Sequence, residues 1–283
     1  MKKLYVEILI LLLLSTNIFC QTNQFGISGG ISYFLGDLGK NPPDGKFYFG
    51  DVEASLFRPT FGVFFRHGFN RWLAVKTSAI YGRIEGDDRL SHYKEFMDNA
   101  WMRKYRNLHF KSHIFEIAVM GEINLMPYTA GSTKKRFAPY ITAGVALFSF
   151  NPKADFEGEM IRLRPLGTEG QGMPGYAKKY SLIQPAFPVG FGLKYNITSF
   201  ITVALEFGHR FTLTDYMDDV STVYANKGDI FNFYEAAAAE KIYVLSRRSV
   251  ESDLEGRYAN ITADGQQRGN PGGKDAYLFS MYR

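Results

Sequence analysis

The sequence predicts an all-β protein, an eight-stranded antiparallel transmembrane β-barrel with long extracellular loops and short periplasmic turns. About eight segments of ten or so residues alternate apolar with small or polar residues, as strands do when one face meets lipid and the other a lumen. The connections between them are alternately short and long, as periplasmic turns and extracellular loops are. The chain has 46% hydrophobic residues, 16% aromatic residues and a mean hydropathy of −0.17. It is too polar for a helical membrane bundle, yet rich in Phe and Tyr.

Residues 1–20 are predicted to form a secretory signal peptide. Lys2 and Lys3 precede the apolar stretch 8–14, which is far shorter than the roughly 20 residues that a helical membrane span needs. A basic start followed by a short apolar run is typical of a secretory signal. Residues 21–283 then form the outer-membrane barrel domain, and the predicted localisation is the bacterial outer membrane.

Cys20 is the only cysteine, so no disulfide can form within one chain. One possible fate is acylation, as in a bacterial lipoprotein, but such signals want a small residue just before the cysteine and Phe19 stands there. Cleavage after Cys20, which leaves Gln21 first, is the favoured prediction.

Each predicted strand places apolar side chains at every second position, on the face expected to contact lipid. In chain order the predicted strands span residues 25–33, 58–67, 73–82, 112–125, 140–147, 184–195, 201–210 and 275–283. The outward sets of the first seven are Phe25, Ile27, Gly29, Ile31 and Tyr33; Phe61, Val63, Phe65 and His67; Leu73, Val75, Thr77, Ala79 and Tyr81; Phe115, Ile117, Val119, Ile123 and Leu125; Ile141, Ala143, Val145 and Leu147; Phe187, Val189, Phe191, Leu193 and Tyr195; and Ile201, Val203, Leu205 and Phe207. Pro185 and Pro188 lack the N–H that a ladder needs, so a bulge or distorted edge is expected in the sixth strand.

The lengths of the connections between strands distinguish a barrel from a soluble β-sandwich, which would also show alternating strands. The short turns are 68–71, 127–136 and 196–199, and the long loops are 36–57, 83–107, 151–179 and 213–274. All short turns fall on one side, which a barrel explains and a sandwich does not. Within the last loop, the Ala-rich stretch 235–241 predicts a short helix, and the Gly-rich stretch 264–273 is expected to be flexible.

The predicted site is structural, a polar core inside the barrel. Eight strands leave an interior that side chains can fill, and charges buried there unpaired would be costly. A salt-bridged plug is therefore expected, with a proton or solute path as the alternative. The inward-facing charges are Arg58, Arg66, Lys76, Glu116, Glu122, Lys194, Glu206 and Arg210.

Catalytic residues are not predicted. A nucleophile and a base must lie within hydrogen-bond reach, and no Ser/His pairing stands out in the sequence. Histidines at strand ends or in loops are the simpler interpretation. The possible bases are His67, His92, His109, His113 and His209.

Metal, cofactor and nucleic-acid sites are not predicted either. Asp215, Asp218 and Asp219 carry oxygen ligands that a hard cation would accept, but they lack the spacing of a calcium loop, and a solvated strand exit is favoured. The loop 165–172 lacks the Gly-Lys-Ser/Thr ending of a phosphate cradle, so its glycines are assigned to tight turns. The pI near 9.0 comes from charges spread along the chain, which does not indicate nucleic acid.

Five segments carry a resemblance to a known family. They are Tyr-Phe-Leu-Gly-Asp-Leu at 33–38, Arg-Phe-Ala-Pro-Tyr at 136–140, Pro-Leu-Gly-Thr-Glu-Gly-Gln-Gly at 165–172, Thr-Asp-Tyr-Met-Asp-Asp-Val-Ser-Thr at 214–222 and Gln-Arg-Gly-Asn-Pro at 267–271. Together they resemble a family of Bacteroidota outer-membrane barrels that includes PorG of the type IX secretion system. One departure is that the sequence ends on Arg283 instead of the aromatic residue typical of such barrels, and the last strand is expected to be short.

The resemblance implies a non-enzymatic barrel, a structural component of type IX secretion. Its partners would be outer-membrane lipid and periplasmic ring proteins, without nucleic acid or a small-molecule substrate. Alternatives from other classes stay open, namely a lipid-modifying barrel enzyme and an adhesin or barrel of unassigned role. A passive pore is disfavoured by the charged lumen.

Overall fold

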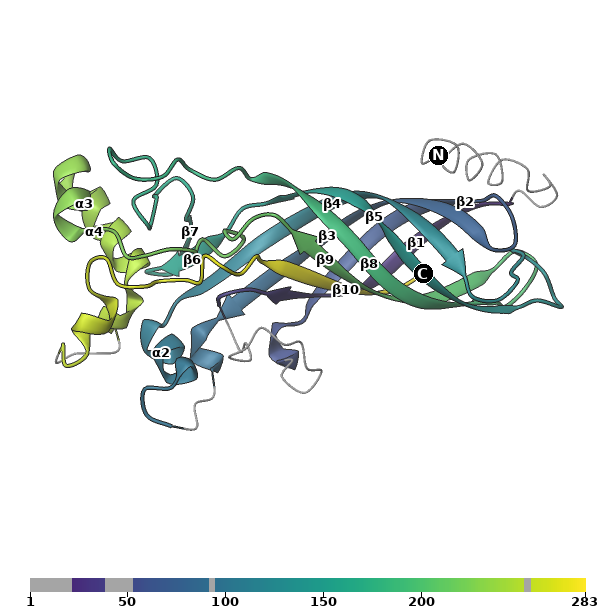
Figure 1. The fold of residues 1–283 in the computed structure, drawn as a ribbon, viewed down its shortest axis with the longest axis horizontal. Helices are drawn as coiled ribbons and strands as arrows, with labels where there is room; N and C mark the ends of the chain where they lie inside the picture. The colour runs from purple at the N-terminus through teal and green to yellow at the C-terminus, as the bar shows by residue number, and fades with distance from the viewer. Residues whose placement is uncertain (1–21, 39–52, 92–94, 252–255) are drawn as a thin grey trace, which may run out of the picture.

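The computed structural model describes residues 22–38, 53–91, 95–251 and 256–283. The predicted signal peptide, Cys20 and His92 lie outside these residues. The barrel strands are β1 Thr22–Leu35, β2 Arg58–Gly68, β3 Leu73–Asp87, β4 His109–Asn124, β5 Phe137–Phe150, β8 Ile183–Asn196, β9 Thr202–Thr212 and β10 Ala276–Tyr282. Each strand pairs antiparallel with the next one in this order, and β1 pairs with β10 to close the ring. The predicted eight-stranded antiparallel barrel is thus confirmed (Figure 1).

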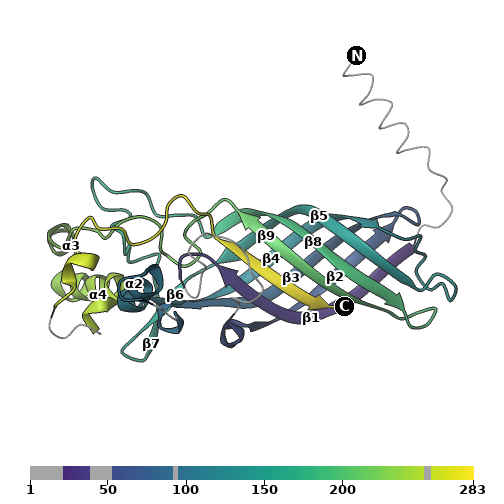
Figure 2. The same ribbon diagram turned by 60° about the horizontal axis from the view of Figure 1, so that its bottom comes forward.

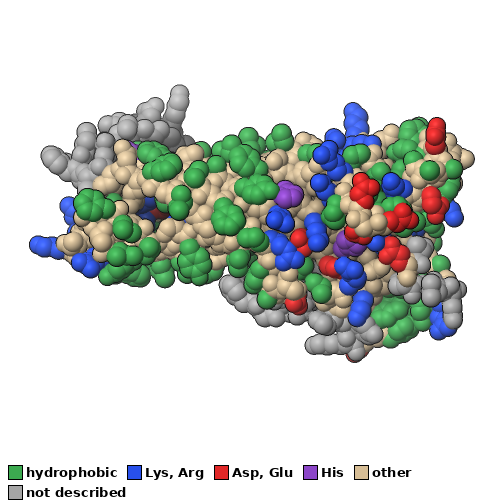
Figure 3. All heavy atoms as spheres, turned by 180° about the vertical axis from the view of Figure 1, so that it is seen from behind, with side chains coloured by type: hydrophobic (Ala, Val, Ile, Leu, Met, Phe, Trp, Pro, Cys, Tyr) green, Lys and Arg blue, Asp and Glu red, His purple; other side chains and the backbone are tan. Residues whose placement is uncertain are grey.

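The barrel wall follows the alternation that the sequence shows. In β4 every second residue is buried, and Phe115, Ile117 and Val119 are exposed on the outside. Figure 3 shows apolar side chains distributed over the barrel, whereas acidic and basic side chains gather over the loop-bearing end. An outer apolar band of this kind is the surface of a membrane-spanning barrel.

One local expectation needs correction, and another is confirmed in part. Tyr33 was assigned to the outward set, but it is buried because Phe57 packs on it edge to face, with ring centroids 5.5 Å apart. The prolines of β8 distort the strand, as expected, but they do so by interrupting its ladder and not by creating a bulge. The register with β5 is the same on both sides of the interruption, at Ala143↔Val189 and Ala146↔Ala186, and only the intervening pairs, opposite Pro188 and its neighbour, are missing from the ladder.

The long connections fold together at one end of the barrel into what we call the cap, the described parts of 36–57, 88–108, 151–182 and 213–275 (Figures 1 and 2). The predicted helix at 235–241 is present and extends further, as α4 Ala236–Ser246. The sequence did not predict the other elements of the cap. These are α2 Asn99–Arg106, α3 Lys227–Phe233, the hairpin β6 Lys153–Phe156 and β7 Glu159–Arg162, and the 3-10 turns η2 Ala54–Leu56, η3 Asp88–Leu90, η4 Arg248–Glu251 and η5 Ala259–Thr262. Across the described residues, no helix is long and apolar enough to cross a membrane.

Three short turns close the opposite end, which we call the turn end, residues 69–72, 125–136 and 197–201. These turns are bonded to one another. Tyr128 donates its backbone N–H to the carbonyl of Arg71 at 3.0 Å, and its hydroxyl donates to Asn196 Oδ1 at 2.6 Å. Asn196 Nδ2 donates to the carbonyl of Thr129 at 2.9 Å. The turn end is therefore one connected surface.

Candidate functional site

The barrel interior is filled by three ionic layers, centred on Glu122, Glu206 and Glu116, and by an apolar layer that extends toward the cap. The layer nearest the turn end is centred on Glu122 of β4. Its Oε1 accepts from Arg66 Nε at 2.8 Å and pairs with the Lys194 ammonium. Arg66 also donates to Gln24 Oε1 at 2.5 Å. The ion pairs of Glu122 link β2, β4 and β8, and the contact between Arg66 and Gln24 adds β1.

The second carboxylate, Glu206 of β9, pairs with Lys76 of β3 across the lumen. The Tyr140 hydroxyl donates to the same carboxylate at 2.7 Å, and Arg283 Nη2 reaches its other oxygen at 3.0 Å. All four polar groups are shielded from solvent, so each charge is balanced by a direct contact with this carboxylate, as a buried ion requires.

Closer to the cap, Glu116 pairs with Arg210 at 3.3 Å and accepts from the Tyr277 hydroxyl at 2.7 Å. Beside this pair and toward the cap the lumen carries an apolar cluster whose members are almost completely buried. The cluster includes Ile80, Ile84, Phe110, Ile114, Phe148 and Phe279. The interior therefore passes from paired charges to closely packed apolar side chains.

Seven of the eight charges predicted to share the lumen are brought together in these layers. Arg58 is not. It lies at the cap-end rim, with its side chain 28% exposed, and pairs with Glu85 at 2.6 Å. The sequence prediction does not include Arg283 and Tyr277, and it places Tyr140 on the inward face of its strand without assigning it to the polar core. The inward positions of all three follow from strand alternation.

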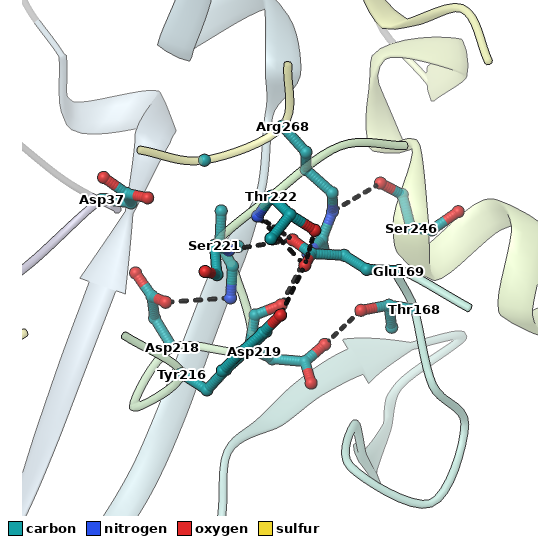
Figure 4. Close-up of polar contacts among 12 residues, drawn as sticks. Asp37, Thr168, Glu169, Tyr216, Asp218, Asp219, Ser221, Thr222, Ser246 and Arg268 are labelled. Atoms are coloured by element: carbon teal, nitrogen blue, oxygen red, sulfur yellow. Dashed lines mark hydrogen bonds and ion pairs between the residues drawn. The ribbon is translucent and has the colours of Figure 1, made fainter. Parts of the chain in front are cut away.

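The cap is held by a second polar network, centred on Glu169 (Figure 4). Glu169 is 5% exposed and accepts from the backbone N–H of Ser221 at 2.8 Å and from the Thr222 hydroxyl at 2.7 Å. Arg268 Nη1 pairs with it at 2.9 Å and also donates to the carbonyl of Asp219 at 2.5 Å. One carboxylate thus joins the third long connection to two points of the fourth.

Asp219 lies beside this pair in a left-handed backbone conformation, with φ of 68°. Its carboxylate accepts from the Thr168 hydroxyl at 2.5 Å and from the Tyr180 hydroxyl at 2.7 Å. Burial raises the pKa of Asp219 to about 6, although the Arg268 charge and both hydroxyls act in the opposite direction. Desolvation is the larger effect because the side chain is fully enclosed.

Arg106 of α2 links the first and second long connections of the cap to the Glu169 network. It makes a two-pronged contact with the buried Asp88, at 2.7 and 2.9 Å. Its remaining nitrogen contacts are to the carbonyls of Arg268 at 2.5 Å and Asp37 at 2.8 Å. The planar guanidinium fork suits a bidentate pair of this kind. All four long connections are therefore linked by buried polar contacts.

Four further carboxylates, Asp37, Asp215, Asp218 and Asp275, lie where the cap meets the barrel. Asp218 accepts from the backbone N–H of Leu38 at 3.1 Å, and Asp275 from that of Met217 at 2.7 Å. Burial raises the pKa of Asp215 to about 7, and it raises those of Asp218 and Asp275 well above their ordinary value. Among the described residues, no group of three His, Cys, Asp or Glu is arranged to hold a metal ion.

These aspartates correct one expectation from the sequence. Asp215, Asp218 and Asp219 were expected at a solvated strand exit, but they are 5%, 1% and 0% exposed. The loop 165–172 also belongs to the buried network, and its turn chemistry was anticipated correctly. Gly167, Gly170 and Gly172 have φ of 68°, 83° and 93°, a region that side-chain-bearing residues rarely adopt.

The described histidines are paired with groups other than a serine. His67 Nδ1 lies 2.7 Å from Asn23 Oδ1, and His113 Nδ1 lies 2.5 Å from the Tyr81 hydroxyl. His109 Nε2 accepts from the backbone N–H of Asp155 at 3.2 Å. The His209 ring packs on Phe211, with centroids 4.2 Å apart.

The segments that carry the family resemblance now have a shared location. Four of the five supply the cap network: 33–38 with Asp37, 165–172 with Glu169, 214–222 with Asp219, and 267–271 with Arg268. The fifth, 136–140, provides Tyr140 of the lumen. The stretch 264–273, expected to be flexible, is instead held through Arg268, whose backbone N–H donates to the carbonyl of Thr222 at 2.8 Å.

Comparison with solved structures finds two similar bacterial proteins. The attachment invasion locus protein Ail of Yersinia pestis, solved with the heparin analogue sucrose octasulfate, is 11% identical over 68% of this chain and 87% of its own, with a TM-score of 0.33. The outer membrane protein OprG of Pseudomonas aeruginosa is 12% identical over 93% of this chain and 96% of its own, with a TM-score of 0.35. No curated protein matches the chain.

A family model described as "Domain of unknown function (DUF6089)" matches residues 2–247. This description assigns no activity, so the link to type IX secretion stays a prediction. The match extends from the first residues to the end of α4 and includes seven of the eight barrel strands. The chain therefore belongs to the DUF6089 family.

Proposed function

We propose that this protein is a non-enzymatic outer-membrane barrel that anchors a protein secretion assembly, of the type IX class, through partners on its periplasmic side. The observation that carries the proposal is the filled interior. Paired charges and an apolar layer occupy the lumen, so the molecule is expected to act through its surfaces and not by conduction. The sequence resemblance of the cap segments to secretion barrels supports the secretion role.

The outer surface supports residence in a membrane. Side chains such as Val145, Phe191 and Ile117 are 59%, 56% and 51% exposed on the barrel wall, and apolar side chains there are favourable only against lipid or another apolar surface. Outer-membrane lipid is thus the first partner that we assign. The short turns then face the periplasm and the cap faces the exterior.

The turn end supports the contact with a periplasmic partner. It carries Arg71, Lys134, Lys135 and Arg136, all exposed, and no Asp or Glu occurs within its three turns. Phe200, at the tip of the last turn, is 94% exposed. A connected surface that combines excess positive charge with an exposed aromatic side chain fits an acidic protein partner, since charge steers encounter and aromatic side chains often dominate binding energy.

The first test is deletion of the gene, with secreted cargo scored in the medium and the tagged barrel localised in membrane fractions. The proposal expects cargo to be lost from the medium while the outer membrane stays intact. Normal secretion in the deletion strain would contradict the secretion role. Normal secretion with altered lipid modification would favour the lipid-modifying enzyme instead.

Complementation then tests the turn end. Lys134→Glu with Lys135→Glu reverses two charges on the proposed docking surface, and we expect it to leave barrel assembly unchanged while reducing secretion. The matched control, Lys178→Glu with Lys241→Glu, reverses two charges on the cap and should restore secretion fully. Equal secretion by both double variants would contradict docking at the turn end.

A further inference from the structure

The part of the sheet that projects beyond the barrel rim has a basic outer face. The hairpin of β3 and β4 continues past the last pair of β4 with β5, Ile114↔Phe150, and the hairpin of β6 and β7 extends this sheet through the pair Lys111↔Lys153. The inner face of the projecting sheet packs on the apolar layer of the lumen, through Ile84, Phe110, Ala154 and Ile161. Strand alternation therefore turns the neighbouring side chains outward.

Three cations stand side by side on this outer face, and we call them the basic row. Lys111 of β4 is directly opposite Lys153 of β6, which is directly opposite Arg162 of β7. Arg83 of β3 lies on the same face, opposite His113 and nearer to the barrel. Within the described residues, the side chains of these four cations form no ion pair or hydrogen bond. Like charges on directly opposed residues are destabilising, so the basic row favours an anionic ligand.

The surrounding carboxylates do not cancel this charge. Two of the three described carboxylates on the same face are already paired, Glu85 with Arg58 and Asp87 with Arg89. The third, Asp155, faces four unpaired cations, which leaves three positive charges in excess. Three lysines and four acidic residues occur in the segments outside the described residues, 39–52, 92–94 and 252–255. Including them changes the balance by a single charge.

The basic row lies just beyond the apolar band of the wall. On β4 and its extension the outward positions from Leu125 to Phe115 carry apolar side chains or glycine. These ten residue steps of about 3.4 Å, at a strand tilt of about 40°, give a height of about 26 Å, close to the roughly 25 Å of an outer-membrane apolar band. His113 and Lys111 are the next two outward positions, so they lie at the level of the lipid headgroups. Tyr81, whose hydroxyl lies 2.5 Å from His113 Nδ1, is placed as interfacial aromatic side chains are.

The positive charge is concentrated on one side of the wall. Figure 3 shows basic side chains gathered where the apolar wall meets the loop-bearing end. At the same end, β8 and β9 instead present the exposed apolar side chains Ile183, Phe211 and Leu213. A ligand attracted by the charge would therefore bind at β3, β4 and the β6–β7 hairpin.

We propose that the basic row, together with Arg83, binds the phosphate of a glycolipid in the outer leaflet. Lysine and arginine bind phosphate oxygens through charge-assisted hydrogen bonds, and clusters of basic residues at a membrane edge attract anionic headgroups. The acyl chains of the same lipid would lie against Phe115 and Ile117, which are 44% and 51% exposed below the row. The site rests on the proposed residence in the outer membrane with the cap outside, and it does not depend on the secretion role.

The test is native mass spectrometry of the full-length barrel, released from zwitterionic detergent micelles after titration with phosphorylated lipid A or with the same lipid A stripped of phosphate. We expect the phosphorylated lipid to bind more tightly. Lys111→Gln with Lys153→Gln relieves the repulsion within the row, so the barrel should fold while its affinity for phosphorylated lipid A falls about tenfold or more. The matched control, Lys178→Gln with Lys227→Gln, removes two exposed cations of the cap and should bind as the wild type does.

Equal binding of the two lipids, or an unchanged affinity in the Lys111 and Lys153 double variant, would overturn the proposal. An equal loss in the control double variant would also do so, because any cations of the cap would then serve. Lys111→Arg with Lys153→Arg keeps both charges and should keep the affinity, and a loss there would contradict a site based on charge. Heat-dependent migration of each variant in SDS gels verifies the closed barrel. Lipid binding and secretion are measured separately, so failure of this site is distinguishable from failure of the secretion role.

Discussion

At the scale of single residues, Glu169 holds the segments of the cap together. Its two oxygens accept from Arg268, Ser221 and Thr222, which come from two distant parts of the last long connection. A carboxylate this deeply buried is tolerated because its partners replace the hydration that it loses. Removing it leaves the Arg268 charge uncompensated and frees the backbone N–H groups of Ser221 and Thr222, which is more costly than the loss of an exposed ion pair.

We therefore expect Glu169→Ala to destabilise the closed cap by about 3–5 kcal/mol, with the barrel strands unaffected. Glu169→Gln keeps one acceptor oxygen and should lose less. Hydrogen exchange followed by mass spectrometry, on the purified barrel in micelles, would detect faster exchange of 214–222 and 267–269 in Glu169→Ala. Exchange equal to that of the wild type would show that the pair does not hold the cap.

The cap should also respond to pH, and the sign follows from Asp215. Burial, with Asp37 and Glu169 nearby, raises its pKa to about 7 against the opposing effects of Ser221 and Lys274, from an ordinary value of about 4. The closed cap then binds this proton more tightly than the open one, so its stability is fully present below about pH 4 and is lost as pH rises through about 7.

Hydrogen exchange at pH 5 and pH 8, corrected for intrinsic rates, checks this expectation. The segment around Asp215 should be better protected at pH 5, and Asp215→Asn should reduce the difference between the two values. Greater protection at pH 8 would reverse the assigned sign.

At the scale of elements, what the sequence revealed depended on periodicity. The lipid-facing alternation located seven of the eight barrel strands, but the prediction ended β3 at residue 82, while the strand continues to Asp87. Beyond that point the outward positions carry the charged residues Arg83 and Glu85, of which Glu85 pairs with Arg58, so the apolar signal of the outward face disappears. Alternation also placed most lumen charges, because inward positions are fixed once the outward ones are known.

The helices of the cap were harder to predict for two different reasons. The Ala-rich composition predicts α4, whereas the sequence signals for α2 are the capping residues at its two ends. Asp98 accepts from the backbone N–H of Trp101 at 2.6 Å as its N-cap, and Asn107 ends it with φ of 59°. The Glu169 network had no such signal, since Glu169 and Arg268 are separated by 99 residues and no periodicity relates them.

The strand assignment makes a prediction about depth in the membrane. Val145, in the middle of β5, is exposed on the outer face, so Val145→Arg should destabilise the barrel in lipid vesicles by about 2–4 kcal/mol. Phe137→Arg, at the turn-end start of the same strand, should cost about 0–1 kcal/mol. Urea unfolding of both variants in vesicles measures the difference, and equal costs would contradict the proposed position of the bilayer.

At the scale of the whole molecule, three regions have separate tasks. The wall is apolar outside and paired with its neighbours all around, the lumen is filled with balanced charges and an apolar layer, and the cap covers one end. An eight-stranded barrel has little interior space beyond what side chains occupy. The molecule is therefore built to present the cap and the turn end on opposite sides of a membrane, and side chains of the described residues fill the lumen between them.

Reconstitution of the wild-type barrel into planar lipid bilayers, with conductance recorded at neutral pH, tests this claim most directly. We predict no steady conductance, because Lys76, Glu206 and the neighbouring side chains fill the lumen beneath the apolar layer. A stable ohmic conductance from the purified wild-type protein would contradict the closed lumen, and with it the view that this barrel acts through its surfaces.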